Sequence, residues 1–153
     1  MSLPYDSIAD TRKHSDRVRQ LLSFVSYELT ARGRSHDASK MREPELSIFN
    51  EYTPKLKTST FGSEEYKGHL AAMGEGLVHH YAHNSHHPEH FPEGVDGMTL
   101  IDLLEMLMDW KAATERHDNG DISRSIRLNA ERFHMAPQLV KILDNTIVAL
   151  DLL

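Results

Sequence analysis

Cysteine is missing from all 153 residues of the sequence. Its absence excludes disulfide frameworks, cysteine-based zinc fingers, iron–sulfur clusters and thiol nucleophiles. Any metal ion must therefore be held by nitrogen and oxygen ligands. Phosphate-binding P-loops and Gly-x-Gly-x-x-Gly turns are also missing, which argues against a nucleotide-binding α/β fold.

Long apolar runs and an excess of basic residues are missing as well. No stretch of about 18 apolar residues occurs, and the first residues lack the charged-then-apolar pattern of a secretory signal. We therefore expect a cytoplasmic protein without a membrane partner. The formal net charge of −6 with histidines neutral argues against the broad basic surface that an extended nucleic acid needs. It leaves room for a local pocket that binds one small phosphate ester.

Apolar residues recur at helical spacing along most of the chain, and alternating strand patterns are scarce. The patterns predict a single-domain, all-α bundle of five to six helices that spans residues 1–153, a length that supplies a real hydrophobic core. The approximate helix ranges are 6–32, 35–52, 63–87, 100–115, 122–133 and 137–152. Between the second and third of these, Pro54 and residues 55–62 predict a connection.

Histidine is concentrated in residues 78–91, which hold six of the chain's eleven histidines. Imidazole is the commonest protein ligand for zinc, iron, copper and nickel, so this density predicts a metal site. A histidine-rich surface loop and hydrogen-bonded core histidines are the alternatives. The apolar stripe that ends at Leu77, continued by helical steps, places His80 and His87 on the core side of the third helix.

Further candidates lie nearer the N-terminus. His14 lies seven residues before Leu21 on the apolar stripe of the first helix, where a satisfied core histidine is the alternative to a ligand. His36 and Asp37 are adjacent at the expected start of the second helix, where one nitrogen and one carboxylate can reach the same ion. Lys40 follows one turn later as a cation for an anionic substrate, with a solvated lysine as the alternative.

One carboxylate stands in an apolar part of the expected fourth helix. Asp109 lies between Met106 and Trp110, where an ionised carboxylate is costly unless it is paired or coordinated. It is therefore a ligand candidate. A salt bridge to Lys111 or Arg116 is the alternative, although both lie at poor helical offsets for pairing.

The order of these residues resembles the HD-domain superfamily of metal-dependent phosphohydrolases. That order is a histidine on the first helix, an adjacent His-Asp at the second, further histidines on the third and an aspartate late on the fourth. Residues 36–40, His-Asp-Ala-Ser-Lys, have the His-Asp-x-x-Lys form that is frequent in that superfamily. Segments 86–89, 97–100 and 107–113 also look like those of a family of uncharacterised bacterial and phage HD-like proteins. The resemblance covers roughly residues 10–150.

The resemblance implies an HD-domain-like helical bundle with the ion at its centre. Four residues would match the superfamily ligands: His14, His36, Asp37 and Asp109. In members with two metals, further histidine ligands would fall on His80, His86 and His87, and the aspartate of the pair bridges both ions. The Gly-Tyr-Pro signature of the cyclic-dinucleotide branch is missing, so hydrolysis of cyclic dinucleotides is not expected.

Together these features predict a metal-dependent phosphohydrolase, either a phosphomonoesterase or a phosphodiesterase. Its substrate would be a nucleotide or another small phosphorylated metabolite, and its cofactor one or two ions of manganese, iron, cobalt, nickel or zinc. Asp37 would act through the metal, and Lys40 would meet the phosphate. An HD-fold di-iron oxygenase and a non-catalytic metal- or partner-binding helical protein are the alternatives. The sequence leaves the oligomeric state open, a homodimer included.

Overall fold

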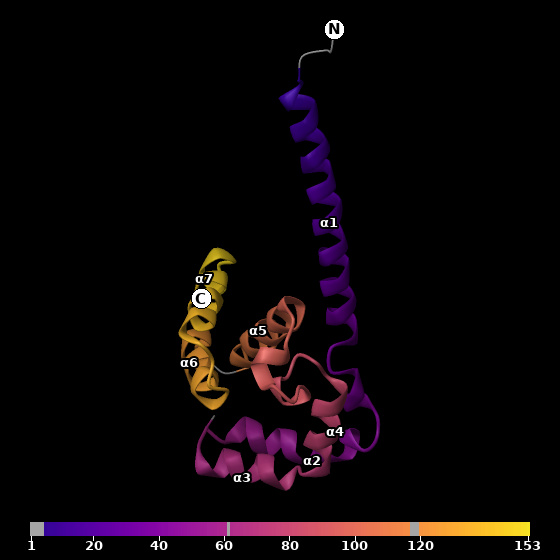
Figure 1. Ribbon diagram of the computed structural model, residues 1–153. Coiled ribbons are helices and arrows are strands. Elements are labelled where there is room, and N and C mark those ends of the chain that lie inside the picture. The colour runs from indigo at the N-terminus through magenta and orange to yellow at the C-terminus, as the bar shows by residue number, and fades with distance from the viewer. Residues whose placement is uncertain (1–4, 61, 117–119) are drawn as a thin grey trace. The chain divides into compact units, whose positions relative to one another are not determined.

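The computed structural model describes residues 5–60, 62–116 and 120–153, and every regular element within these ranges is helical (Figure 1). The all-α prediction is confirmed. The described residues form seven α-helices, so the expected five to six is too low. The chain divides into two compact units, residues 1–36 and 37–153. The single domain over residues 1–153 stays a prediction.

The first unit contains one long helix, α1 (Ser7–Ser35). It begins where the Asp6 carboxylate accepts hydrogen bonds from the backbone N–H groups of Ile8 and Ala9, both at 3.0 Å, as an N-cap does. The helix continues to Ser35, slightly beyond the predicted end at Gly33, and His36 is its C-terminal cap residue. A single helix cannot cover its own apolar stripe, so residues such as Val18 and Leu21 are exposed in this unit.

The second unit opens with a turn rather than with the predicted helix at residues 35–37. Asp37 adopts left-handed backbone angles (φ 57°, ψ 18°) and leads into the short helix η1 (Ala38–Met41). Helix α2 (Glu45–Thr58) follows and passes through Pro54, where a connection was predicted. That prediction was wrong because a proline late in a helix removes only one N–H donor and need not end it.

The predicted third helix is two helices, α3 (Glu64–Ala72) and α4 (Glu75–His83). The chain breaks at Gly74, whose φ of +41° is a left-handed conformation that glycine tolerates and other residues rarely adopt. Helix α4 then ends at His83, and Asn84 caps it by donating a side-chain hydrogen bond of 2.7 Å to the carbonyl of His80. Residues 84–87 therefore form a turn instead of continuing the helix.

Helix α4 packs closely on α2 at Gly76. A Cβ atom at this position would lie 2.8 Å from the Ile48 side chain, so no larger residue fits without movement. The close approach compensates for the low helix propensity of glycine. It also brings α4 against the N-terminal part of α2, next to the histidines.

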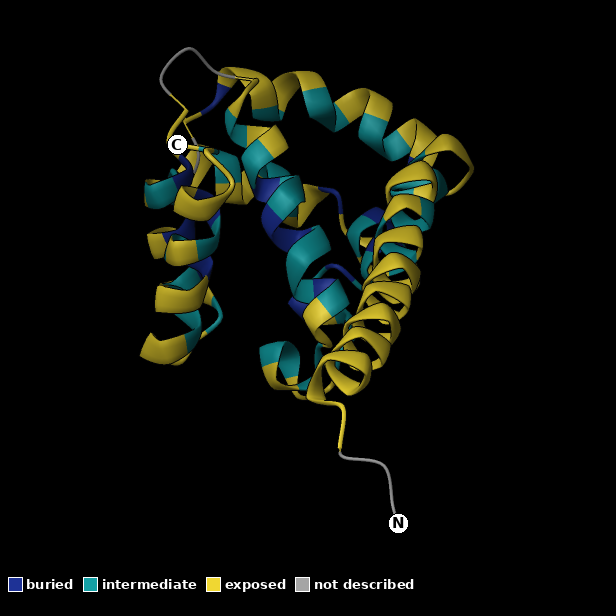
Figure 2. Ribbon diagram, turned by 90° about the horizontal axis from the view of Figure 1, so that it is seen from above, coloured by how far each residue is buried: buried dark blue, intermediate teal, exposed yellow. Residues whose placement is uncertain are grey.

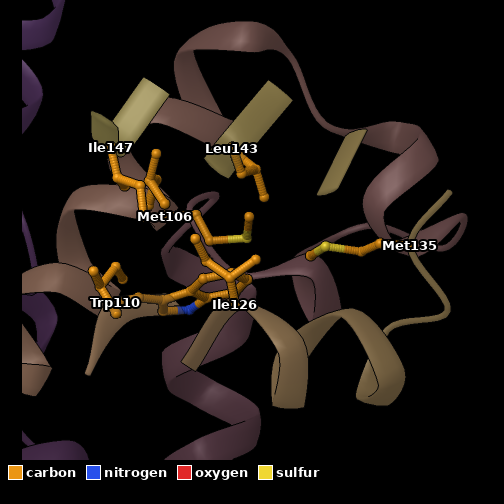
Figure 3. Packing of buried hydrophobic residues seen from close by; sticks show 8 residues of the cluster. Met106, Trp110, Ile126, Met135, Leu143 and Ile147 are labelled. Atoms are coloured by element: carbon orange, nitrogen blue, oxygen red, sulfur yellow. The ribbon is translucent and has the colours of Figure 1, made fainter. Parts of the chain in front are cut away.

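The remaining elements are the short helices η2 (Pro88–His90) and η3 (Gly94–Gly97), then α5 (Leu100–Thr114), α6 (Ile122–Arg132) and α7 (Pro137–Ala149). Buried and half-buried residues cover most of α5, as Figure 2 shows. The apolar core joins α5, α6 and α7 (Figure 3), and consists of Met106, Leu107, Trp110, Ile122, Ile126, Met135, Leu143 and Ile147. Among the described residues, no helix is long and apolar enough to cross a membrane.

Candidate metal centre

Four side chains converge within the second unit. Asp37, His80, His86 and His87 each offer one ligand atom, and these four atoms all lie within 4.8 Å of one another. Ligand atoms bonded to one transition-metal ion at about 2.0–2.2 Å lie roughly 3–4 Å apart. The set therefore has the chemistry and the spacing to hold a metal ion. We call these four residues the metal centre.

Asp37 supplies the carboxylate of the metal centre from the turn before η1. Its Oδ1 atom lies 3.4 Å from Nε2 of His80 and 3.5 Å from Nε2 of His86. Its Oδ2 atom accepts a 2.6 Å hydrogen bond from Nζ of Lys40. A left-handed conformation at a residue other than glycine is uncommon and is found disproportionately at functional sites. At Asp37 this conformation places the carboxylate next to the imidazoles of His80 and His86 and the ammonium group of Lys40.

A buried carboxylate orients His80. Nδ1 of His80 lies 2.9 Å from Oε2 of Glu45, and the two side chains are 1% and 0% exposed. An ionised carboxylate only accepts hydrogen bonds, so Nδ1 of His80 carries the proton and Nε2 presents its lone pair toward Asp37. This carboxylate–imidazole arrangement is the one that commonly supports histidine ligands of metals.

His86 and His87 complete the metal centre from the turn after α4. Nδ1 of His86 lies 3.3 Å from Oε1 of Glu105 on α5, which assigns the proton to Nδ1 by the same reasoning. Nε2 of His87 lies 2.9 Å from Nε2 of His80. That separation suits an N–H···N hydrogen bond without metal, or two lone pairs directed at one ion.

Burial favours the neutral form of His80 and His87 in the metal centre. It lowers the pKa of His80, and the Lys40 ammonium lowers it further, against the opposing effect of Asp37 and Glu45. Burial also lowers the pKa of His87 to about 3, with neighbouring His86 and His80 acting in the same direction. A neutral imidazole is the form that binds metal.

Glu45 accepts several of the hydrogen bonds around the metal centre. It accepts from Nδ1 of His79 at 2.6 Å and from Oγ of Ser39 at 2.9 Å, and Nδ2 of Asn84 donates to Ser39 at 2.8 Å. Burial raises the pKa of Glu45, but the hydrogen bonds from both histidines and Ser39 outweigh it, so the pKa is lowered overall. Glu45 also lies in the first turn of α2, where the helix dipole favours negative charge.

Asp109 on α5 lies beside the metal centre. Its carboxylate comes within 4.8 Å of that of Asp37. Burial lowers the pKa of nearby His87, and the negative charge of Asp109 partly opposes that lowering. The fold therefore brings together five of the seven predicted ligands: Asp37, His80, His86, His87 and Asp109. Lys40, predicted to meet substrate, contacts Asp37 directly.

The two other predicted ligands, His14 and His36, belong to the first unit. His14 lies on an exposed part of α1, and His36 ends that helix immediately before Asp37 in the chain. Their roles as ligands stay predictions.

Two acidic residues around the metal centre were not predicted. Glu105 lies four residues before Asp109, hence on the same face of α5, and this helical spacing was a usable signal. Glu45 gave no such signal, since a glutamate within a predicted helix is ordinarily a solvated residue. Only the packing of α4 on α2 buries it between His79 and His80.

No curated protein and no solved structure matches the chain. One protein family does match, over residues 3–149, and its description is "family of unknown function". That description names neither an HD domain nor an activity, so the resemblance to the HD-domain superfamily stays a prediction. Because the match covers nearly the whole sequence, the chain belongs to this family of unknown function, DUF5662.

Proposed function

We propose that the protein is a metal-dependent hydrolase of small phosphate esters, with nucleotides or other small phosphorylated metabolites as its substrate class. The observation that carries the proposal is the convergence of Asp37, His80, His86 and His87, with two of the imidazoles oriented by carboxylates. Nitrogen and oxygen ligands of this kind suit manganese, iron, cobalt, nickel or zinc.

The metal and the nearby residues have separate tasks in this proposal. A divalent ion, when bound, neutralises charge that develops on phosphate oxygens and makes water a better nucleophile at neutral pH. Glu45 and Glu105 hold the imidazoles of His80 and His86 with Nε2 directed inward. Their negative charges also increase the basicity of these ligands.

Lys40 supplies a positive charge beside the metal centre. Its ammonium group donates to Oδ2 of Asp37 at 2.6 Å and lies 4.7 Å from the centre of the Phe49 ring. An ammonium group has three donors, so the Asp37 contact leaves donors for a phosphate oxygen. Lys40 thus orients the ester while Asp37 holds the metal.

Asp109 favours a centre with two ions rather than one. A second carboxylate within 4.8 Å of Asp37 adds an oxygen ligand beyond the four that one tetrahedral ion takes. Two ions about 3.5–4 Å apart are a common arrangement in phosphate-ester hydrolases. Asp37 and Asp109 would both help to hold the ions.

The test combines metal analysis with an activity panel. The protein as purified is analysed for its metal-to-chain ratio, then assayed on phosphomonoesters and phosphodiesters with added manganese, cobalt, nickel or magnesium. We expect bound metal and hydrolysis, both lost in Asp37→Ala and His86→Ala and retained in the control His69→Gln on α3. Thermal melting shows whether each variant is folded.

Three results would overturn the proposal. Metal bound in the expected residues without hydrolysis across the panel would indicate a non-catalytic metal-binding protein. Two irons, visible absorption bands and oxygen uptake without phosphatase activity would indicate an oxygenase. Hydrolysis that survives in folded Asp37→Ala would place the chemistry elsewhere.

A further inference from the structure

A group of tyrosines and arginines lies beside the metal centre and has no part in holding metal. Its members come from four regions of the second unit: Tyr66 on α3, Tyr81 on α4, Arg116 after α5, and Arg132 at the end of α6. Residues so far apart in sequence have no local reason to gather. Together they offer phenol and guanidinium hydrogen-bond donors, which suit an anionic ligand.

Tyr81 connects this group to the metal centre. Its ring lies 5.1 Å from the ring of His87, centre to centre, and its phenol lies within reach of the Arg132 side chain. Arg132 also donates from Nη2 to Oε1 of Glu89 at 2.6 Å. Glu89 lies two residues after His87 in η2. The guanidinium group is thus held one tyrosine side chain away from a ligand of the metal centre.

Tyr66 lies within electrostatic reach of Arg132, Arg116 and Asp109. Burial raises the pKa of Tyr66, Arg132 and Arg116 lower it, and Asp109 raises it. A phenol is protonated at neutral pH and can donate a hydrogen bond to an anion.

Arg132 is accessible for binding. Its side chain is 46% exposed, and its ion pair with Glu89 lies at the surface, where such pairs contribute little to stability. A guanidinium group has five N–H donors in a planar fork that matches phosphate oxygens. An anionic ligand can thus contact Arg132 without dismantling a buried network.

We propose that Arg132 and Tyr81 form a second anion-binding subsite next to the metal centre. The ester bound at the metal centre accordingly carries another anionic group, as in a diphosphate or a bisphosphate. This inference rests on the proposed function, because it assigns the second group of the same substrate. It separates such substrates from simple monoesters, which leave the subsite unused.

The test compares two non-hydrolysable probes, methylenediphosphonate and methylphosphonate, which differ by one anionic group. Isothermal titration calorimetry measures both against manganese-loaded protein freed of excess ion. We expect the diphosphonate to bind more tightly, and Arg132→Gln to weaken it by about tenfold while leaving methylphosphonate binding unchanged. The control is Arg127→Gln on the same helix, whose partner is Asp144; it should change neither affinity.

Glu89→Gln distinguishes binding from a structural role. If the Glu89–Arg132 pair only joins α6 to η2, either variant weakens the fold and binding together. If Arg132 binds the second anion, Glu89→Gln removes a competing negative charge and increases diphosphonate affinity. Equal affinity for the two probes, or no loss in folded Arg132→Gln, overturns the inference.

Failure of the proposed function has a different signature. The titrations are repeated with metal removed by a chelator and dialysis. Diphosphonate binding that needs Arg132 but not metal supports the subsite and contradicts the hydrolase proposal. Binding of neither probe in either form contradicts both.

Discussion

The second unit buries two regions of opposite chemistry. Around α5, α6 and α7 the buried residues are mostly apolar, with Leu107 and Ile126 fully covered. Around α2, α4 and the turn after α4 most buried side chains are polar, and two ionisable ones, Glu45 and His80, are 0% and 1% exposed. Apolar packing tolerates approximate partners, whereas a buried ionisable group is stable only with specific ones. The two regions should therefore respond differently to substitution, to pH and to metal.

The largest effect on stability is expected in the apolar region. Leu107→Ala removes a fully buried side chain from the α5–α7 core and should lower the free energy of unfolding by about 2–5 kcal/mol. Urea denaturation measures the loss. Ile142→Ala on α7, at a 51% exposed position, is the matched control and should cost far less. The folded fraction of Leu107→Ala should still bind metal, and loss of metal binding from folded protein would contradict the separation of the two regions.

In the polar region, Glu45→Gln tests the orienting carboxylate. The substitution keeps the shape but removes the charge that accepts from His79 and His80, so metal affinity should fall by about 10–100-fold. Competition with a chromophoric chelator measures it. Glu51→Gln in the same helix, where the carboxylate pairs with exposed Lys55, is the control. Equal affinity in the two variants would show that Glu45 has no role in the centre.

The pH dependence of stability should come from the polar region. The pKa of His80 is lowered, and that of His87 is about 3, whereas unfolded histidines titrate near about 6.5. Between these values the unfolded chain binds more protons, so stability falls as pH decreases below about 6.5. For metal-free protein we expect the melting temperature to drop between pH 7 and pH 5.

His87→Asn provides the control for that pH dependence. Without the imidazole, one histidine no longer contributes, and the drop in melting temperature should be smaller than in the unchanged chain. Leu107→Ala should lower the melting temperature equally at both pH values, because the core cluster contains no titratable group. A melting temperature that is constant from pH 7 to pH 5 would contradict a neutral His80 and His87.

The smallest effect is expected at an exposed ion pair. Arg127 makes two hydrogen bonds of 3.0 and 2.8 Å to Asp144, between α6 and α7. Exposed pairs contribute about 0–1 kcal/mol and weaken with salt. Arg127→Gln should therefore change the free energy of unfolding by less than about 1 kcal/mol, measured at low and high salt. A larger effect would mean that charge contributes to stability in the apolar region too.

Local sequence patterns predict the helical class and most of the candidate ligands. Apolar spacing along the chain is a local property, and so is the density of histidines in residues 78–91. Both features can be recognised in the sequence alone. Helix ends were less predictable: the break at Gly74 and the passage of α2 through Pro54 depend on packing that outweighs local propensity.

The tertiary structure sets which side chains lie close together. It showed that Asp37 meets His80 and His86, that His87 lies against His80, and that Asp109 lies near Asp37. It also revealed Glu45, which the sequence places inside a predicted helix without distinction, as the buried partner of two histidines. Burial and hydrogen bonding depend on contacts between residues about 35–45 positions apart, and periodicity within one helix carries no information about such contacts.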